Sequence, residues 1–96
     1  MKKVIWKFPF DVKDNFTVGM PAGAQVLCVQ TQFDKPNIWA MVNQEKEIHT
    51  RHFRIIGTGA PFEEDPCNEE TIYIGTFQEQ GGALIWHLFE VFKINN

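Results

Sequence analysis

Apolar and polar residues alternate along most of this chain, with the period of two residues that is typical of β-strands. The first alternating segment spans residues 3–10, and its apolar face carries Val4, Trp6, Phe8 and Phe10. Further segments of this kind follow at regular spacing, over residues 16–20, 25–33, 38–42, 48–56, 73–80 and 83–92. Since no segment combines end caps with the 3.6-residue period of a helix, the pattern predicts an all-β fold.

The last two segments are expected to form a hairpin. Residues 73–80 and 83–92 flank a Gly-Gly pair at 81–82, and glycines readily adopt the positive φ angles of a two-residue primed turn. Counting outward from this turn sets Phe77 opposite Trp86. One face is then expected to carry Tyr73, Phe77, Leu84, Trp86 and Leu88, and the other Ile74, Thr76, Ile85, His87, Phe89 and Val91. Both faces are largely apolar, which predicts that both are covered.

A second hairpin is predicted for residues 25–33 and 38–42, joined by a four-residue loop that sets Phe33 opposite Ile38. Its apolar face would carry Leu27, Val29, Phe33, Ile38, Ala40 and Val42, and its reverse face Gln30, Gln32, Trp39 and Met41. The register of the next segment, 48–56, is left open. A four-residue loop before it would set Arg51 opposite Ile38 on the core face, so a bulge or a longer loop is favoured.

These elements predict a single-domain antiparallel β-sandwich, or a small barrel, of about seven strands over residues 1–96. The residues expected in its core are Val4, Trp6, Phe8, Leu27, Val29, Phe53, Ile55, Phe77, Trp86 and Leu88. Residues 60–71 interrupt the strands with two prolines and five acidic residues. Like charges repel one another, so this segment is predicted to be an exposed and mobile loop.

The bulk composition restricts the environment and the partners. No apolar run reaches the ~18–20 residues that a membrane helix needs, and the N-terminal segment lacks the features of a signal peptide. The net charge is −3, with eight basic and five acidic residues in 1–56 but one basic and seven acidic residues in 57–96. Because phosphate binding needs a concentrated basic face, nucleic acid is not an expected partner, and neither is a membrane.

Candidate catalytic and metal-binding residues do not form a recognisable set. His49 and His52 are an odd number of residues apart, which sends them to opposite faces of a strand. The chain contains no serine, and Cys28 and Cys67 have no ligand-like spacing, so they are expected to be reduced thiols. We therefore expect no enzyme activity, no metal and no cofactor, and we expect the three histidines to be dispensable.

Several strings along the chain resemble a family of small, uncharacterised bacteriophage and prophage proteins. These strings are Pro21-Ala22-Gly23-Ala24, Ile38-Trp39-Ala40-Met41-Val42, Phe53-Arg54-Ile55-Ile56-Gly57-Thr58-Gly59, Ile74-Gly75-Thr76-Phe77 and the segment 82–90. The resemblance implies a phage-encoded accessory protein in the cytoplasm of an infected bacterial host. It brings no assigned activity and therefore no catalytic residue.

Binding is the remaining class of function, in three forms. The first is an inhibitor that contacts a host protein, such as a defence protein, through Trp39, Met41, Gln30 and Gln32 or through the acidic side chains of Glu63, Glu64 and Asp65. The second is a virion or assembly component, and the third is an oligomeric sponge for a small nucleotide, which would draw on Arg51, Arg54 and Trp39. A homodimer is expected, either through the apolar stripe of Ile85, His87, Phe89 and Val91, which is favoured, or through the reverse face of the second hairpin around Trp39 and Met41.

Overall fold

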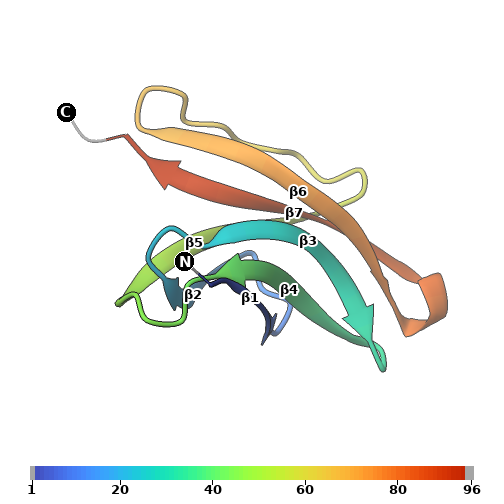
Figure 1. The fold of residues 1–96 in the computed structure, drawn as a ribbon. Coiled ribbons are helices and arrows are strands. Elements are labelled where there is room, and N and C mark those ends of the chain that lie inside the picture. The colour runs from blue at the N-terminus through green and yellow to red at the C-terminus, as the bar shows by residue number, and fades with distance from the viewer. Residues whose placement is uncertain (1, 95–96) are drawn as a thin grey trace.

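The computed structural model describes residues 2–94, and it is built from strands in two antiparallel sheets (Figure 1). The seven strands are β1 (Val4–Pro9), β2 (Asn15–Pro21), β3 (Gln25–Gln32), β4 (Lys35–Val42), β5 (Ile48–Gly57), β6 (Glu69–Glu79) and β7 (Leu84–Lys93). One sheet has the order β1-β4-β3 and the other β2-β5-β7-β6. The two sheets pack together as a sandwich, which confirms the predicted fold class; residues 1, 95 and 96 of the predicted domain lie outside the described residues.

The β6–β7 hairpin has the predicted pairing. Phe77 lies opposite Trp86, and the turn places Gly81 and Gly82 at φ angles of 65° and 96°, as a primed turn requires. The Ala83 N–H donates to the Gln80 carbonyl across the turn, with a nitrogen-to-oxygen distance of 3.2 Å. Further along β6, a bulge lies between Tyr73 and Gly75. It places the residues that precede it on the opposite face of the sheet from the one predicted.

This bulge corrects two predicted positions. Tyr73 lies opposite Phe89 and packs against its ring on the outer face of the sheet, and not on the face of Trp86. Ile74 turns inward and packs against the core. Gly75 follows the bulge at a point where β6 approaches β3 of the other sheet closely, since a Cβ atom built on it would lie 2.9 Å from Cγ1 of Val29.

The β3–β4 hairpin has a tighter turn than predicted. Gln32 pairs with Lys35, so Phe33 and Asp34 alone form the loop, with φ angles of 53° and 61°. The four-residue loop was therefore wrong, and so was the placement of Phe33 on the apolar face of the hairpin, because its side chain is 97% exposed in the turn. From Cys28 to Gln32 the new register differs from the predicted one by an even number of residues, so the faces there are unchanged; before Cys28 a bulge changes them.

The segment between β4 and β5 carries the chain from one sheet to the other. β5 pairs with β2 and β7 and not with β4, which explains why no hairpin register suited this segment. Arg51 consequently stays on the inner face of the sandwich, where it finds an acidic partner on β7.

The core lies between the sheets and is centred on Met20, Ile38, Phe53 and Leu88, which are fully buried. Phe10 stacks on Phe16 with a ring-centroid distance of 4.7 Å. The other core predictions are confirmed for Val29, Ile55 and Phe77, and Trp6, Phe8 and Trp86 are partly buried against this core. Two were wrong: Val4 is 36% exposed at the edge strand β1, and Leu27 is 41% exposed at a bulge in β3. Residues 2–94 include no helix of the length and apolarity that crossing a membrane requires.

Candidate functional site

The outer face of the three-stranded sheet brings together one of the predicted sets of binding residues. Gln30, Gln32, Trp39 and Met41 all point away from the core, because their neighbours Val29, Ile38, Ala40 and Val42 are buried. Ile5 pairs with Met41 from β1, and Lys7 and Cys28 flank Trp39. We call this surface the Trp39 face; its members are Ile5, Lys7, Cys28, Gln30, Gln32, Trp39 and Met41.

Trp39 occupies the central strand of the Trp39 face. Its side chain is partly buried, and its indole Nε1 is buried without a hydrogen-bond partner among residues 2–94. A buried donor that loses its bond to water costs about 1–3 kcal/mol. A phenylalanine would fill similar space without this cost.

Polar side chains frame the tryptophan. Lys7 Nζ donates to Gln32 Oε1 at 2.8 Å, and this bond spans β4 because β1 and β3 lie on either side of it. Gln30 is exposed in the same row, and Ile5 is 58% exposed at the edge. The Trp39 face thus combines an aromatic centre, exposed apolar surface and free amide groups, a composition typical of protein interfaces.

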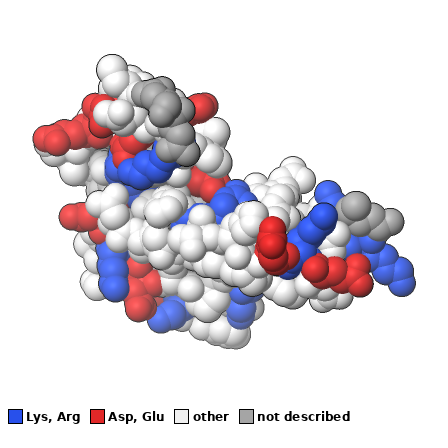
Figure 2. Space-filling view, turned by 90° about the vertical axis from the view of Figure 1, so that its left-hand side faces the viewer, with Lys and Arg blue, Asp and Glu red and all other residues white. Residues whose placement is uncertain are grey.

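The charge of the Trp39 face is positive. The strands β1, β3 and β4 contain no aspartate or glutamate, and Lys7 is the charged member of the face. Lys35 pairs with Asp11 outside the strands at 3.2 Å. Elsewhere the two signs are mixed, as the end of the molecule seen in Figure 2 shows, where basic and acidic side chains are interspersed.

The acidic candidates lie on the opposite side of the sandwich. Glu63, Glu64 and Asp65 are exposed in the connection between β5 and β6, which runs back along the outer side of β6 and β7 (Figure 1). Phe62 anchors this connection by packing edge-to-face on Phe89, at a centroid distance of 4.8 Å. Residues 60–68 of the predicted loop are mostly exposed, as the sequence predicted, whereas residues 69–71 were wrongly assigned to the loop and begin β6; the mobility of the connection stays a prediction. Two separate surfaces, and not one, therefore carry the proposed partner-binding residues.

The residues proposed for self-association are partly covered by the same connection. Val91 is buried, Phe89 lies between Phe62 and Tyr73, and Ile85 remains exposed. A pocket of about 230 Å³ opens beside them, and it is lined by Ile56, Gly57, Thr58, Gly59, Ala60, Phe62, His87 and Phe89. This pocket and the side chain of Ile85 are therefore the parts of the predicted self-association surface that a second molecule can reach.

His87 is held by hydroxyl groups on both ring nitrogens. Nδ1 lies 2.8 Å from Thr76 Oγ1, and Nε2 lies 2.7 Å from Thr58 Oγ1. The Tyr73 hydroxyl lies 2.5 Å from Thr76 Oγ1 and extends the chain of bonds. These contacts tie the start of the β5–β6 connection to β7. Within the described residues, no group of three or more metal-ligating side chains is placed to hold a metal ion.

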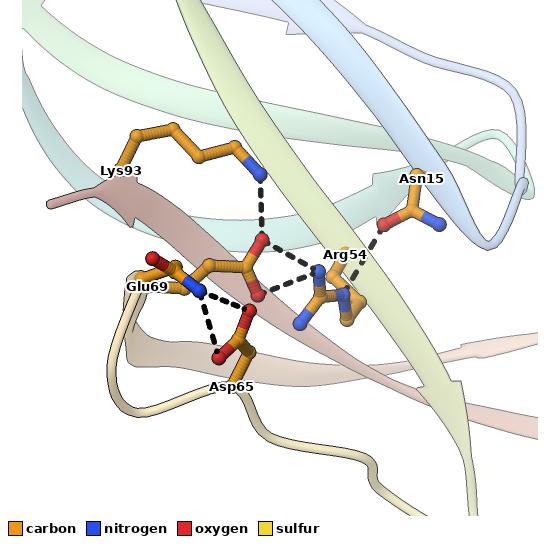
Figure 3. A network of polar contacts seen from close by, with 6 residues as sticks. Asn15, Arg54, Asp65, Glu69 and Lys93 are labelled. Atoms are coloured by element: carbon orange, nitrogen blue, oxygen red, sulfur yellow. Dashed lines mark hydrogen bonds and ion pairs between the residues drawn. The ribbon is translucent and has the colours of Figure 1, made fainter. Parts of the chain in front are cut away.

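A polar network on the outer face of the four-stranded sheet was not predicted (Figure 3). Arg54 donates to Glu69 Oε1 at 3.2 Å and to Asn15 Oδ1 at 3.1 Å, and Lys93 donates to Glu69 Oε2 at 2.6 Å. The hydrogen bond from Lys93 is the main cause that lowers the pKa of Glu69, and Arg54 adds to it, while partial burial acts in the opposite direction. No sequence signal pairs these residues, because they come from strands far apart in the chain.

A buried ion pair between the sheets was also missed. Arg51 donates to both carboxylate oxygens of Glu90 and, through Nη1, to the Ala24 carbonyl at 2.9 Å. Glu90 is 5% exposed. One signal was present in the sequence: Glu90 interrupts an apolar strand, and Arg51 fell on the core face in one of the registers considered.

Comparison with known proteins adds a family and nothing more specific. No curated protein and no solved structure matches this chain. The model of one protein family matches residues 1–95, which is almost the whole chain. The protein therefore belongs to DUF7352, a family described as a domain of unknown function.

Proposed function

We propose that this protein acts without catalysis, by binding another protein through the Trp39 face. The observation that carries the proposal is the buried indole N–H of Trp39, which has no hydrogen-bond partner among the described residues, at the centre of an outward-facing sheet surface. A fold that needed only packing at this position would be better served by phenylalanine, so the tryptophan is more readily explained by a contact. Tryptophan is among the residues that contribute most to binding energy at interfaces.

The chemistry of the Trp39 face defines the partner. Lys7 donates to the neutral amide of Gln32 and gives the face a positive charge, so an acidic protein surface is complementary to this face. The amides of Gln30 and Gln32 supply hydrogen bonds around the aromatic centre. The resemblance to bacteriophage and prophage proteins supports a host protein, such as a defence protein in the bacterial cytoplasm, as the bearer of this surface.

The alternative of a nucleotide sponge has less support from the geometry. Its three candidate residues do not converge: Arg51 lies inside the sandwich on Glu90, Arg54 lies on Glu69, and Trp39 lies on the other sheet. Nothing in the arrangement specifically favours a virion component.

A pair of substitutions at one exposed position tests the proposal. The tagged wild-type protein is used to capture partners from a host lysate, each captured protein is identified and purified, and its affinity is then measured. Gln30→Glu places a negative charge on the face and should weaken binding about tenfold or more, which corresponds to about 1.4 kcal/mol. Gln30→Lys should bind at least as tightly as the wild type. Ile85→Glu, on the opposite sheet, serves as the matched control and should not change the affinity.

Two results would contradict the proposal. One is a purified partner that binds Gln30→Glu as tightly as the wild type but loses affinity for Ile85→Glu. The other is the absence of any captured protein whose affinity responds to position 30.

A further inference from the structure

The side chain of Phe33 protrudes from the tip of the β3–β4 hairpin. It is 97% exposed, and its backbone has a φ angle of 53°, a region that L-residues with a side chain rarely adopt. Left-handed backbone at a residue other than glycine costs about 1–2 kcal/mol. The backbone conformation of Phe33 therefore destabilises the fold, and its exposed ring contributes no compensating burial within the chain. A contact with another molecule explains why this residue is present.

The turn that carries Phe33 is fixed in place. Asp34 Oδ1 accepts a hydrogen bond from the backbone N–H of Gln80 at 3.2 Å, which links the β3–β4 turn to the β6–β7 turn. Figure 1 shows both turns at the same end of the molecule, at the lower right. Because the turn is already ordered, little conformational entropy is lost when the ring enters a binding pocket.

A pocket that fits such a ring lies on the same chain. It is the one of about 230 Å³ beside His87, whose walls include Ile56, Phe62 and Phe89. An apolar cavity of about 150 Å³ is large enough for benzene, so a phenyl ring fits this volume. The rings of Phe62 and Phe89 allow the edge-to-face contacts that aromatic side chains prefer.

We propose that Phe33 of one copy of the protein inserts into this pocket of a second copy. A protruding apolar side chain and a complementary pocket elsewhere on the same molecule lead to self-association, either as a closed reciprocal dimer or as an open chain. Phe89 and His87 of β7 line the pocket. The contact therefore uses the part of the β6–β7 hairpin that the connection between β5 and β6 does not cover. This inference is independent of the partner proposed for the Trp39 face.

Sedimentation equilibrium of the purified protein tests the contact, over about a hundredfold range of concentration. The wild type should exceed the monomer mass of 11.1 kDa at high concentration. Phe33→Asn should stay monomeric, and it should melt at the same temperature or higher, because asparagine tolerates positive φ. Ala60→Phe fills the pocket from its rim and should also be monomeric, which tests the contact from the other side. Ile5→Asn removes an exposed apolar side chain from the Trp39 face and should leave association unchanged.

Each other result overturns the proposal. A wild type that remains at 11.1 kDa throughout excludes the contact. Association that survives both Phe33→Asn and Ala60→Phe excludes these two surfaces, and association that is lost only in Ile5→Asn assigns the interface to the Trp39 face.

Discussion

Arg51 of β5 and Glu90 of β7 form a bidentate ion pair on the inner face of the four-stranded sheet, with Arg51 Nη2 at 2.9 Å from Glu90 Oε1. Both residues line a cleft of about 310 Å³, together with Leu27, Ile72 and Phe92. Two charges thus occupy a position at the end of the core where apolar side chains would be expected. Such a pair is costly to break on one side only, because the remaining charge is left buried and unpaired.

Breaking this ion pair should be strongly destabilising, and removing it completely should be less so. Glu90→Leu and Arg51→Met are each expected to lower the free energy of unfolding by about 3–5 kcal/mol. The double variant should lose clearly less than the two single losses combined, since it leaves no uncompensated charge. Urea denaturation of the four proteins measures these values, and strictly additive losses would show that the residues do not act as a pair.

Gly75 should be intolerant of any side chain. A Cβ atom there would lie 2.9 Å from Cγ1 of Val29, so Gly75→Ala forces the edges of β6 and β3 apart. We expect a loss of about 1–3 kcal/mol, as is usual for overpacking. In a Val29→Ala background the same substitution should cost much less, because the clashing methyl group is gone. Thermal unfolding of the four variants checks this, and an equal cost in both backgrounds would place the clash elsewhere.

The Glu69 network should make stability depend on acid pH. The pKa of Glu69 is lowered in the folded protein, so its contribution is complete above the ordinary glutamate pKa of about 4.3 and is lost as the pH falls through the folded value. The wild type should therefore lose more stability than Glu69→Gln when the pH is lowered from about 6 to about 3, an interval that includes the ordinary glutamate pKa of about 4.3. Melting temperatures measured across this range test the sign. If the melting temperatures of the two proteins fell in parallel with pH, Glu69 would contribute nothing to the pH dependence of stability.

Trp39→Phe should leave the fold as stable as before or stabilise it by about 1–2 kcal/mol, because it removes a buried donor for which residues 2–94 provide no acceptor. Trp86→Phe is the matched control: the Trp86 indole donates to Glu79 Oε1 at 3.1 Å, so that substitution should destabilise. Denaturant unfolding of both variants compares them. A large loss for Trp39→Phe would show that the indole is needed for packing.

Where the sequence predicted the structure correctly, a local signal was present. Gly81 and Gly82 determine a primed turn, and the register of β6 and β7 follows from it. The β3–β4 turn carries only a weak signal: aspartate tolerates the positive φ angle of Asp34, but phenylalanine is not a usual choice for the positive φ angle of Phe33. Four members of the Trp39 face, Gln30, Gln32, Trp39 and Met41, were nevertheless predicted to lie together, because alternation within the two strands decides which of their residues share a face. The addition of Ile5 and Lys7 from β1 was not predicted.

The remaining errors come from contacts between distant segments. A single extra residue in a strand exchanges its faces, and this moved Tyr73 to the outer face and exposed Leu27. The pairing of Arg51 with Glu90, and of Arg54 with Glu69, depends on how β5 meets β7 and β6 across the sheet. Alternation within one segment contains no information on such pairs.

The most direct test of the central claim follows the indole N–H resonances of the protein during titration with its purified binding partner. The resonance of Trp39, assigned by its absence in Trp39→Phe, should shift or broaden as the complex forms, because the indole lies at the centre of the proposed interface. The resonance of Trp86, which is bonded to Glu79 on the other sheet, should stay in place. A complex that forms with the Trp39 resonance unchanged would contradict the account.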